Sequence, residues 1–140
     1  MAVFRTTGPE QTEQLGRKIA AVLNGTEVIA YFGGLGMGKT TLTRGIAEGL
    51  CSDSNVSSPT FAIVNEYIGK YNIYHFDMYR VESWEDLYST GFFDYLDTGV
   101  LLIEWSENIE NALPEHTVRI TISKGDSEDE RFFDIEGLEL

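Results

Sequence analysis

The sequence has little cysteine, few basic residues and no long apolar run, and each shortage disfavours a class of protein. Its one cysteine, Cys51, cannot form a disulfide within the chain, which agrees with a reducing compartment and leaves no basis for a cysteine metal cluster. No apolar run approaches the length of a membrane span, and residues 1–7 lack the core of a signal peptide. We therefore expect a cytoplasmic protein with no membrane segment.

Positive charge is the second shortage. The 140 residues include 10 Lys and Arg against 23 Asp and Glu, which gives a net charge of −13. Proteins that bind nucleic acid concentrate Lys and Arg, so tight direct binding to a polyanion is not expected. A basic protein partner fits this acidic surface more easily.

Residues 33–40 read Gly-Gly-Leu-Gly-Met-Gly-Lys-Thr and fill the pattern G-x-x-x-x-G-K-[ST] without a substitution. Glycines let successive backbone N–H groups turn toward the phosphates of a nucleotide. Lys39 supplies a positive charge for the β- and γ-phosphate oxygens, and Thr40 supplies a hydroxyl ligand for Mg²⁺. The motif predicts binding of ATP or another nucleoside triphosphate together with Mg²⁺. The expected nucleotide-binding residues are Gly33, Gly34, Leu35, Gly36, Met37, Gly38, Lys39, Thr40 and Thr41.

The hydrophobic pattern predicts an α/β fold in a single domain, residues 1–140. The expected strands are 3–6, 26–32, 61–67, 71–77, 99–105, 117–122 and 131–135, and the expected helices are 9–23, 40–50, one near Leu87, and 107–113. Short links make 61–77 and 117–135 antiparallel hairpins. Ser83 and Ser106 are expected to cap the helices that follow them. The predicted class is a three-layer P-loop NTPase-like fold whose mixed sheet has a central parallel part and antiparallel hairpins.

Two carboxylates, Asp77 and Glu104, end apolar strands and are candidates for the second half of the site. In open α/β sheets, ligands lie at the carboxyl ends of the strands. Glu104 is the better direct ligand for the metal or its water, whereas Asp77 could contact the metal through water or orient an attacking water. The sequence does not separate these roles. Thr60, in the polar loop 51–60, offers a hydroxyl to the γ-phosphate or to Mg²⁺. We expect Lys39, Thr60, Asp77 and Glu104 to be catalytic, with Thr40 and Glu104 as metal ligands.

Two other features have weaker signals. His75 is expected to pack within its hairpin rather than to act as a base, and alternation along the strand places it on the same face as Asp77. The adenine pocket has no motif of its own, and helix 9–23 is the candidate for its wall because the N-terminal strand and helix must pack near the loop.

Several absent motifs narrow the choice among nucleotide-binding proteins. The chain has no Asn-Lys-x-Asp sequence, which disfavours a GTPase, and no Leu-Ser-Gly-Gly-Gln sequence of a transporter ATPase. Only Arg80, Arg119 and Arg131 follow the loop helix, too few for the arginine-rich lid of a nucleotide kinase. An ATPase is the leading hypothesis. A small-molecule phosphotransferase of the P-loop kinase type and a nucleotide-dependent adaptor without hydrolysis remain open.

Four segments together resemble the TsaE family of bacterial tRNA threonylcarbamoyladenosine (t6A) biosynthesis. They are Gly-Gly-Leu-Gly-Met-Gly-Lys-Thr-Thr at 33–41, Val-Ser-Ser-Pro-Thr-Phe at 56–61, Tyr-His-Phe-Asp-Met-Tyr-Arg at 74–80, and Ile-Glu-Trp-Ser at 103–106. The middle two are the more diagnostic, because generic ATPases lack them. The departures are modest: Gly34 and Met37 replace the Asp and Ala often seen, and Ser106 stands where Pro commonly follows Trp.

The resemblance implies a small α/β ATPase that binds Mg-ATP and hydrolyses it weakly, in dependence on its partners TsaB and TsaD. These proteins together install threonylcarbamoyl on adenosine 37 of tRNA, with TsaD rather than this subunit handling the tRNA. By resemblance, Thr40 and Glu104 fall on the Mg²⁺ ligands and Asp77 on the acid of the catalytic site. Thr60 falls on the switch loop, and Trp105 lies beside the metal acid.

Overall fold

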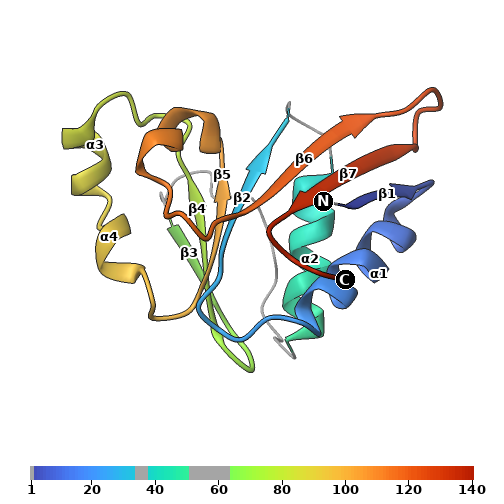
Figure 1. Ribbon diagram of the computed structural model, residues 1–140, viewed down its shortest axis with the longest axis horizontal. Coiled ribbons are helices and arrows are strands. Elements are labelled where there is room, and N and C mark those ends of the chain that lie inside the picture. The colour runs from blue at the N-terminus through green and yellow to red at the C-terminus, as the bar shows by residue number, and fades with distance from the viewer. Residues whose placement is uncertain (1, 34–37, 51–63) are drawn as a thin grey trace.

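Seven strands join in one mixed sheet in the order β1-β7-β6-β2-β5-β4-β3 (Figure 1). The computed structural model describes residues 2–33, 38–50 and 64–140. The strands are β1 (Ala2–Thr6), β2 (Val28–Phe32), β3 (Val64–Ile68), β4 (Asn72–Asp77), β5 (Val100–Glu104), β6 (Val118–Lys124) and β7 (Arg131–Glu136). The helices are α1 (Pro9–Ala20), α2 (Lys39–Gly49), α3 (Trp84–Ser89), α4 (Phe92–Tyr95) and the 3-10 helix η1 (Ser106–Ala112).

The centre of the sheet is parallel and both of its sides are antiparallel. Strands β6, β2, β5 and β4 run in one direction, whereas β3 pairs antiparallel with β4, and β7 pairs antiparallel with both β6 and β1. The carboxyl ends of β2, β4 and β5 therefore meet at one edge of the sheet, where Asp77 lies opposite Glu104 in the register. The prediction of a mixed sheet with a central parallel part and antiparallel hairpins is confirmed.

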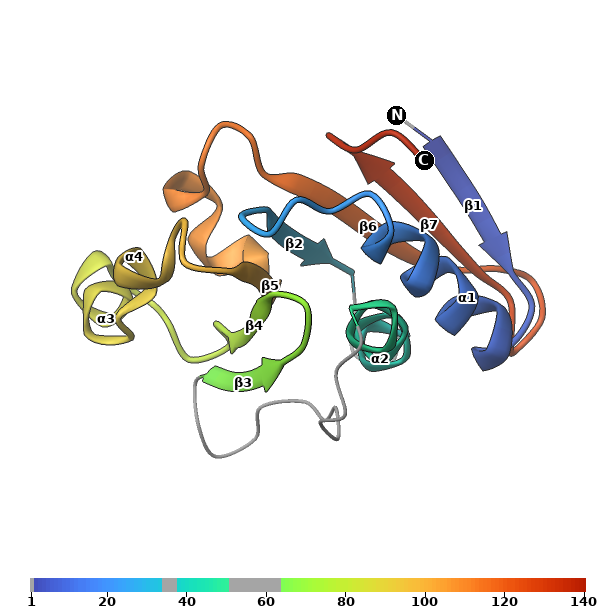
Figure 2. The ribbon, with the colours of Figure 1, turned by 90° about the horizontal axis from the view of Figure 1, so that it is seen from below.

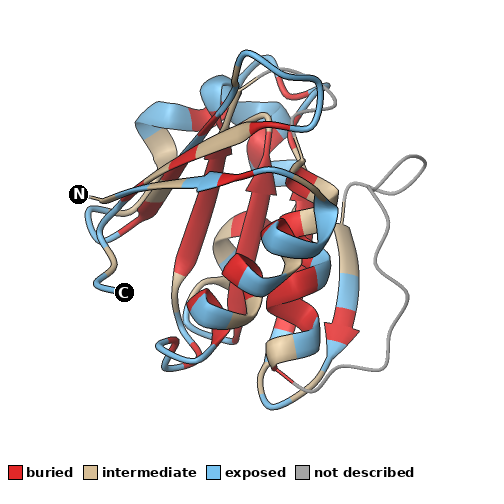
Figure 3. Cartoon of the chain, turned by 90° about the vertical axis from the view of Figure 1, so that its right-hand side faces the viewer, coloured by how far each residue is buried: buried red, intermediate tan, exposed pale blue. Residues whose placement is uncertain are grey.

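Helices cover both faces of the sheet, so the fold has three layers (Figures 1 and 2). Alternate residues of each strand point to opposite faces. Tyr31 and Leu102 pack with α1 and α2 on one face, and Leu101 and Ile103 pack with α3, α4 and η1 on the other. The four apolar residues of β5 are fully buried, and Figure 3 shows the buried residues concentrated along the central strands. Among the described residues no helix is long and apolar enough to cross a membrane.

Helices α1 and α2 touch backbone to backbone through two glycines. A Cβ on Gly16 would lie 2.6 Å from the carbonyl oxygen of Leu42, and a Cβ on Gly45 would lie 2.3 Å from the carbonyl oxygen of Glu13. Only glycine fits at such distances. This contact packs the middle of α1 against the middle of α2.

Helix α4 was not among the expected helices, α2 and η1 each begin and end one residue earlier than expected, and larger differences occur at the end of α1 and at the start of η1. Helix α1 ends at Ala20 rather than near Leu23. Ser83 caps α3 as predicted, because its hydroxyl accepts the backbone N–H of Asp86 at 3.1 Å. The cap predicted at Ser106 is wrong: Ser106 lies inside η1, and its hydroxyl donates to the Ile103 carbonyl at 2.9 Å.

Candidate functional site

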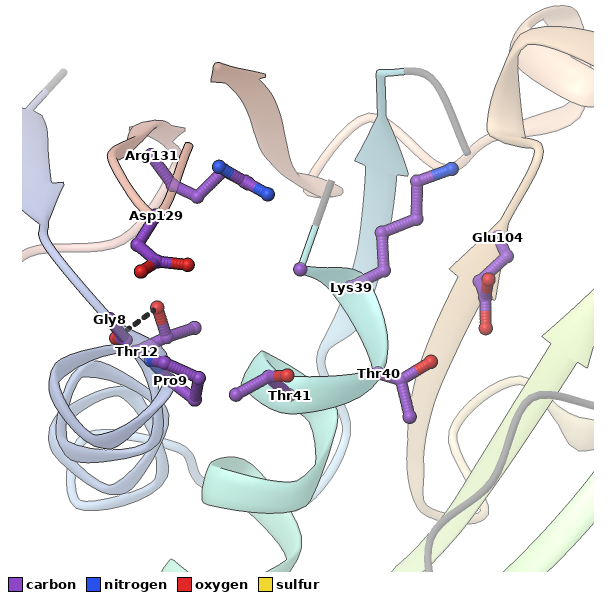
Figure 4. Close-up of a pocket in the computed structure, with 10 residues that line it drawn as sticks. Gly8, Pro9, Thr12, Lys39, Thr40, Thr41, Glu104, Asp129 and Arg131 are labelled. Atoms are coloured by element: carbon purple, nitrogen blue, oxygen red, sulfur yellow. Dashed lines mark hydrogen bonds between the residues drawn. The ribbon is translucent and has the colours of Figure 1, made fainter. Parts of the chain in front are cut away.

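A pocket of about 310 Å³ lies where the first turns of α1 and α2 meet the carboxyl end of β5 and the β6–β7 turn (Figure 4). Its walls come from distant parts of the sequence. One wall has Lys39 and Thr40 of α2 facing Glu104, and the other has Asp129 and Arg131 above the start of α1. The lining residues are Gly8, Pro9, Thr12, Gly38, Lys39, Thr40, Thr41, Glu104, Asp129 and Arg131. Because α2 begins in the pocket, its positive dipole end favours an anion there.

The ammonium group of Lys39 is buried without a hydrogen-bond partner among the described residues. The residue is only 5% exposed, and Nζ lies 5.4 Å from the centroid of the Trp105 ring. Burying an ammonium group is costly unless an anion or hydrogen-bond acceptors compensate it. Contact with an aromatic face recovers part of that cost. The unmatched charge suits a site that receives an anionic group such as a phosphate.

Glu104 is held in place by a buried histidine. Its Oε2 lies 2.5 Å from Nε2 of His75, and Nδ1 of His75 lies 3.1 Å from the hydroxyl of Tyr67. His75 is fully buried, and Glu104 is 7% exposed. His75 thus packs within the β3–β4 hairpin, as predicted. Its contact with Glu104 was not anticipated, although both residues belong to strands whose carboxyl ends were expected to form the site.

The described residues on both sides of the predicted phosphate loop are anchored. Gly33 has a φ of 130°, and a Cβ there would lie 2.5 Å from the Ile122 carbonyl oxygen, so this position requires glycine. The Gly33 N–H donates to Oε2 of Glu107 in η1 at 3.3 Å. Beyond the loop, the hydroxyls of Tyr31 in β2 and Thr43 in α2 are 2.8 Å apart. Burial raises the pKa of Tyr31 far above its ordinary value, so the hydroxyl stays protonated in this contact.

The described residues could supply some of the ligands of a metal ion that also binds a phosphate, but they could not supply its complete coordination shell. Among the described residues no group of three or more His, Cys, Asp or Glu side chains is placed to hold a metal ion. Mg²⁺ in nucleotide sites takes one or two protein ligands and completes its shell with phosphate oxygens and water. Thr40 and Glu104 both line the pocket and are oxygen ligands of the type Mg²⁺ prefers. These residues fit such a metal.

The structure brings together five of the predicted site residues: Gly38, Lys39, Thr40, Thr41 and Glu104. Asp77 lies beside Glu104 in the sheet but does not line the pocket, and its Oδ1 accepts the backbone N–H of Tyr79 at 2.9 Å. The predicted residues Gly34, Leu35, Gly36, Met37 and Thr60 lie outside the described residues.

The far wall of the pocket contains residues that the sequence did not single out for the site. Thr12 is on α1, the helix expected to border the adenine, and its hydroxyl lies 2.8 Å from that of Thr6. Asp129 and Arg131 come from the β6–β7 hairpin, and Nη1 of Arg131 donates to the carbonyl of Glu130 at 3.0 Å. No local motif marks these residues. Their position beside α1 could have been predicted only from the pairing of β7 with β1.

The same chain matches a protein-family model. The model described as "Threonylcarbamoyl adenosine biosynthesis protein TsaE" covers residues 6–133. The chain belongs to the TsaE family. A similar protein, "tRNA threonylcarbamoyladenosine biosynthesis protein TsaE" of Bacillus subtilis (strain 168), is 42% identical over 134 residues, which are 93% of this chain and 83% of that protein.

Further comparisons agree in sequence and in structure. The protein of the same description from Haemophilus influenzae is 42% identical over 116 residues, with 78% of this chain and 73% of that protein covered. The crystal structure of Bacillus subtilis YdiB matches with a TM-score of 0.72 and 36% identity, over 94% of this chain and 82% of that chain. The family resemblance drawn from the four sequence segments is therefore confirmed.

Proposed function

We propose that this protein is an ATPase subunit of tRNA t6A modification, which binds Mg-ATP in the pocket between α1 and α2 and acts with TsaB and TsaD. The observation that carries the proposal is the buried ammonium of Lys39, which lacks a hydrogen-bond partner among the described residues and lies at the start of α2 opposite Glu104. Membership in a family of threonylcarbamoyladenosine biosynthesis proteins supplies the process.

The residues near β5 would hold the phosphates and the metal. Lys39 would leave the Trp105 ring and pair with phosphate oxygens, while the first N–H groups of α2 would donate to the same oxygens. Thr40 and Glu104 would be the protein ligands of Mg²⁺, which supplies neutralisation of charge on the phosphate oxygens when bound. His75 would keep the Glu104 carboxylate turned to one side through its hydrogen bond. The nucleoside would lie toward Thr12 and Arg131, at the wall formed by α1 and the hairpin.

Weak turnover by the isolated subunit follows from the same arrangement. Asp77, the expected catalytic acid, bonds to its own backbone segment and stays out of the pocket. We propose that contact with TsaB and TsaD completes the site, so hydrolysis depends on these partners. The acidic balance of the chain leaves tRNA binding to them. A cytoplasmic location fits the single cysteine.

The deciding experiment measures ATP turnover by the wild type with and without TsaB–TsaD, and ATP affinity of the Lys39→Met variant by calorimetry. Methionine keeps the apolar stem of Lys39 and removes its charge. Charge-assisted hydrogen bonds contribute about 1.5–3 kcal/mol, so affinity should fall roughly 10- to 150-fold. Lys70→Met is the matched control, because Lys70 lies in the β3–β4 turn, at the opposite end of β4 from the site.

Each alternative has its own outcome. Turnover that requires a small-molecule acceptor instead of protein partners would favour the phosphotransferase hypothesis. Binding without turnover under every condition would favour an adaptor. Unchanged Mg-ATP affinity in Lys39→Met would remove the assigned role of the loop.

A further inference from the structure

The exposed aromatic side chains of the described residues gather in one short segment. Tyr79, Trp84 and Tyr88 are 59%, 53% and 65% exposed, and no other aromatic residue is among the exposed large hydrophobic residues of the described chain. Each ring also lies tilted against a neighbouring ring: the centroids are 4.8 Å apart for Tyr79 and Trp105, 5.1 Å for Tyr88 and Phe93, and 6.4 Å for Trp84 and Tyr88. Rigid, half-exposed Trp and Tyr side chains are the residues that most often carry binding energy at protein interfaces.

A groove of about 250 Å³ runs beside these aromatics, between the start of α3 and η1. We call it the α3–η1 groove. Trp84 is part of its wall, and the buried side chains of Val81, Leu87 and Ile109 reach it from below. The groove is distinct from the pocket at Lys39, since the two share no lining residue.

The groove is acidic. Glu82, Glu107 and Glu110 line it, and no described Lys or Arg does. Glu85 and Asp86 add charge in the first turn of α3. Of these five acids, only Glu110 forms an ion pair with a described residue, at 3.2 Å from Arg119. The uncompensated carboxylates disfavour both a nucleic acid and a second copy of this acidic chain.

We infer that the α3–η1 groove is the docking site for a basic segment of a partner protein, with an arginine seated between the carboxylates and the face of Trp84. A guanidinium group can pair with a carboxylate and stack on an indole ring at the same time, which an ammonium group does less well. The inference rests on the proposed function in one respect: it takes the TsaB–TsaD complex as the protein that carries the basic segment.

The groove is also connected to the phosphate loop. Helix η1 follows Glu104 and Trp105 directly, and Glu107 accepts the N–H of Gly33. Nδ2 of Asn108, another groove residue, donates to the Met78 carbonyl at 2.8 Å, just beyond β4. A segment bound in the groove would therefore contact the helix that anchors the first glycine of the loop. Because coupling between two sites is reciprocal, ATP should strengthen docking by the same factor by which docking strengthens ATP binding.

The test measures binding of immobilised wild type and variants to the purified TsaB–TsaD complex with Mg-ATP present. Trp84→Ala and Glu85→Lys should each weaken binding at least tenfold, whereas the ATP affinity of the isolated variants should stay within twofold of wild type. The matched controls are Ile68→Ala, which trims an exposed apolar residue, and Glu139→Lys, which makes the same change of charge. Both controls should bind as the wild type does.

The outcomes separate the inference from the proposed function. If wild type binds the complex but the groove variants bind equally well, the docking site is refuted and the proposed function stands. If wild type does not bind the complex at all, both fail. Rising salt should weaken wild-type binding more than that of Glu85→Lys, and equal salt dependence would contradict the electrostatic part of the inference.

Discussion

The contact between α1 and α2 gives a prediction that can be worked out from the backbone alone. Gly45→Ala adds one methyl group at a place where its Cβ would lie 2.3 Å from the Glu13 carbonyl oxygen. An ordinary contact of this kind is at least 3.4 Å. The obstacle is backbone, which cannot rotate aside as a side chain can, so the two helices must move apart by about 1 Å, a strain of the kind that overpacking produces.

The expected loss of stability is about 2 kcal/mol. Overpacking of a filled interface costs about 1–3 kcal/mol, and an immovable backbone obstacle places this site at or above the upper end. Alanine recovers about 1 kcal/mol because it favours helix over glycine. For a domain of this size the net loss corresponds to a melting temperature lower by roughly 5–10 °C.

Urea unfolding followed by circular dichroism measures this loss, and Gly8→Ala is the matched control. Nothing lies within 4 Å of a Cβ built on Gly8, and its φ of 175° is extended backbone that alanine adopts freely. Gly8 is the N-cap of α1, where alanine is less favourable than glycine, so the control should lose at most about 1 kcal/mol. A Gly45→Ala protein as stable as this control would show that the helices do not rely on the glycine contact.

Three further predictions concern the site, the surface charge and the hairpin. Glu104→Gln keeps a hydrogen-bond partner for His75 but removes the negative charge. Calorimetry should therefore show that Mg²⁺ no longer strengthens ATP binding, while the affinity for ATP without metal changes less than threefold. If the variant kept the magnesium dependence of the wild type, the role of Glu104 would be structural only. The isolated protein should bind tRNA only weakly at physiological salt because basic residues are few, and submicromolar affinity with a steep salt slope in anisotropy titrations would contradict this. The hydrogen bond from Arg5 lowers the pKa of Glu130 below its ordinary value of 4.5, so Arg5→Ala should raise that pKa in an NMR titration. The Arg5–Glu130 pair stabilises the folded state above pH 4.5, and this stabilisation is lost as the pH falls through the lowered pKa of Glu130. The difference in the free energy of unfolding between wild type and Arg5→Ala should therefore disappear on acidification. A difference that did not change with pH would argue against the pair.

The parts of the fold that could be predicted from sequence are those set by local pattern. The apolar run of β5 specifies a buried strand, the spacing of apolar residues after Lys39 specifies α2, and the short turn after Ile68 fixes an antiparallel pair. Glu104 lines the pocket at the carboxyl edge of the parallel strands, where an acid that ends a buried parallel strand is expected to lie.

The parts that could not be predicted depend on contacts between distant segments. The far wall of the pocket forms because Arg131 lies next to α1. Neither segment has a sequence motif that predicts its contact with the other. Ser106 has the residue type of a helix cap, yet Trp105 before it adopts a left-handed conformation with φ of 60° and turns the serine into the helix. The burial of Lys39 likewise follows from the packing around it rather than from the motif.

The pairing of β1 with β7 has a consequence for how the protein folds. Ala2 lies opposite Ile135, so β1 stays without this partner until β7, about 130 positions later in the chain, has formed. Until then α1 can rest on α2, but the wall that carries Asp129 and Arg131 does not yet exist. Contacts of such long sequence separation form late in folding. A ligand that touches both walls would bind molecules in which β1 and β7 have paired in preference to those in which they have not, and in doing so would protect the folded state from unfolding.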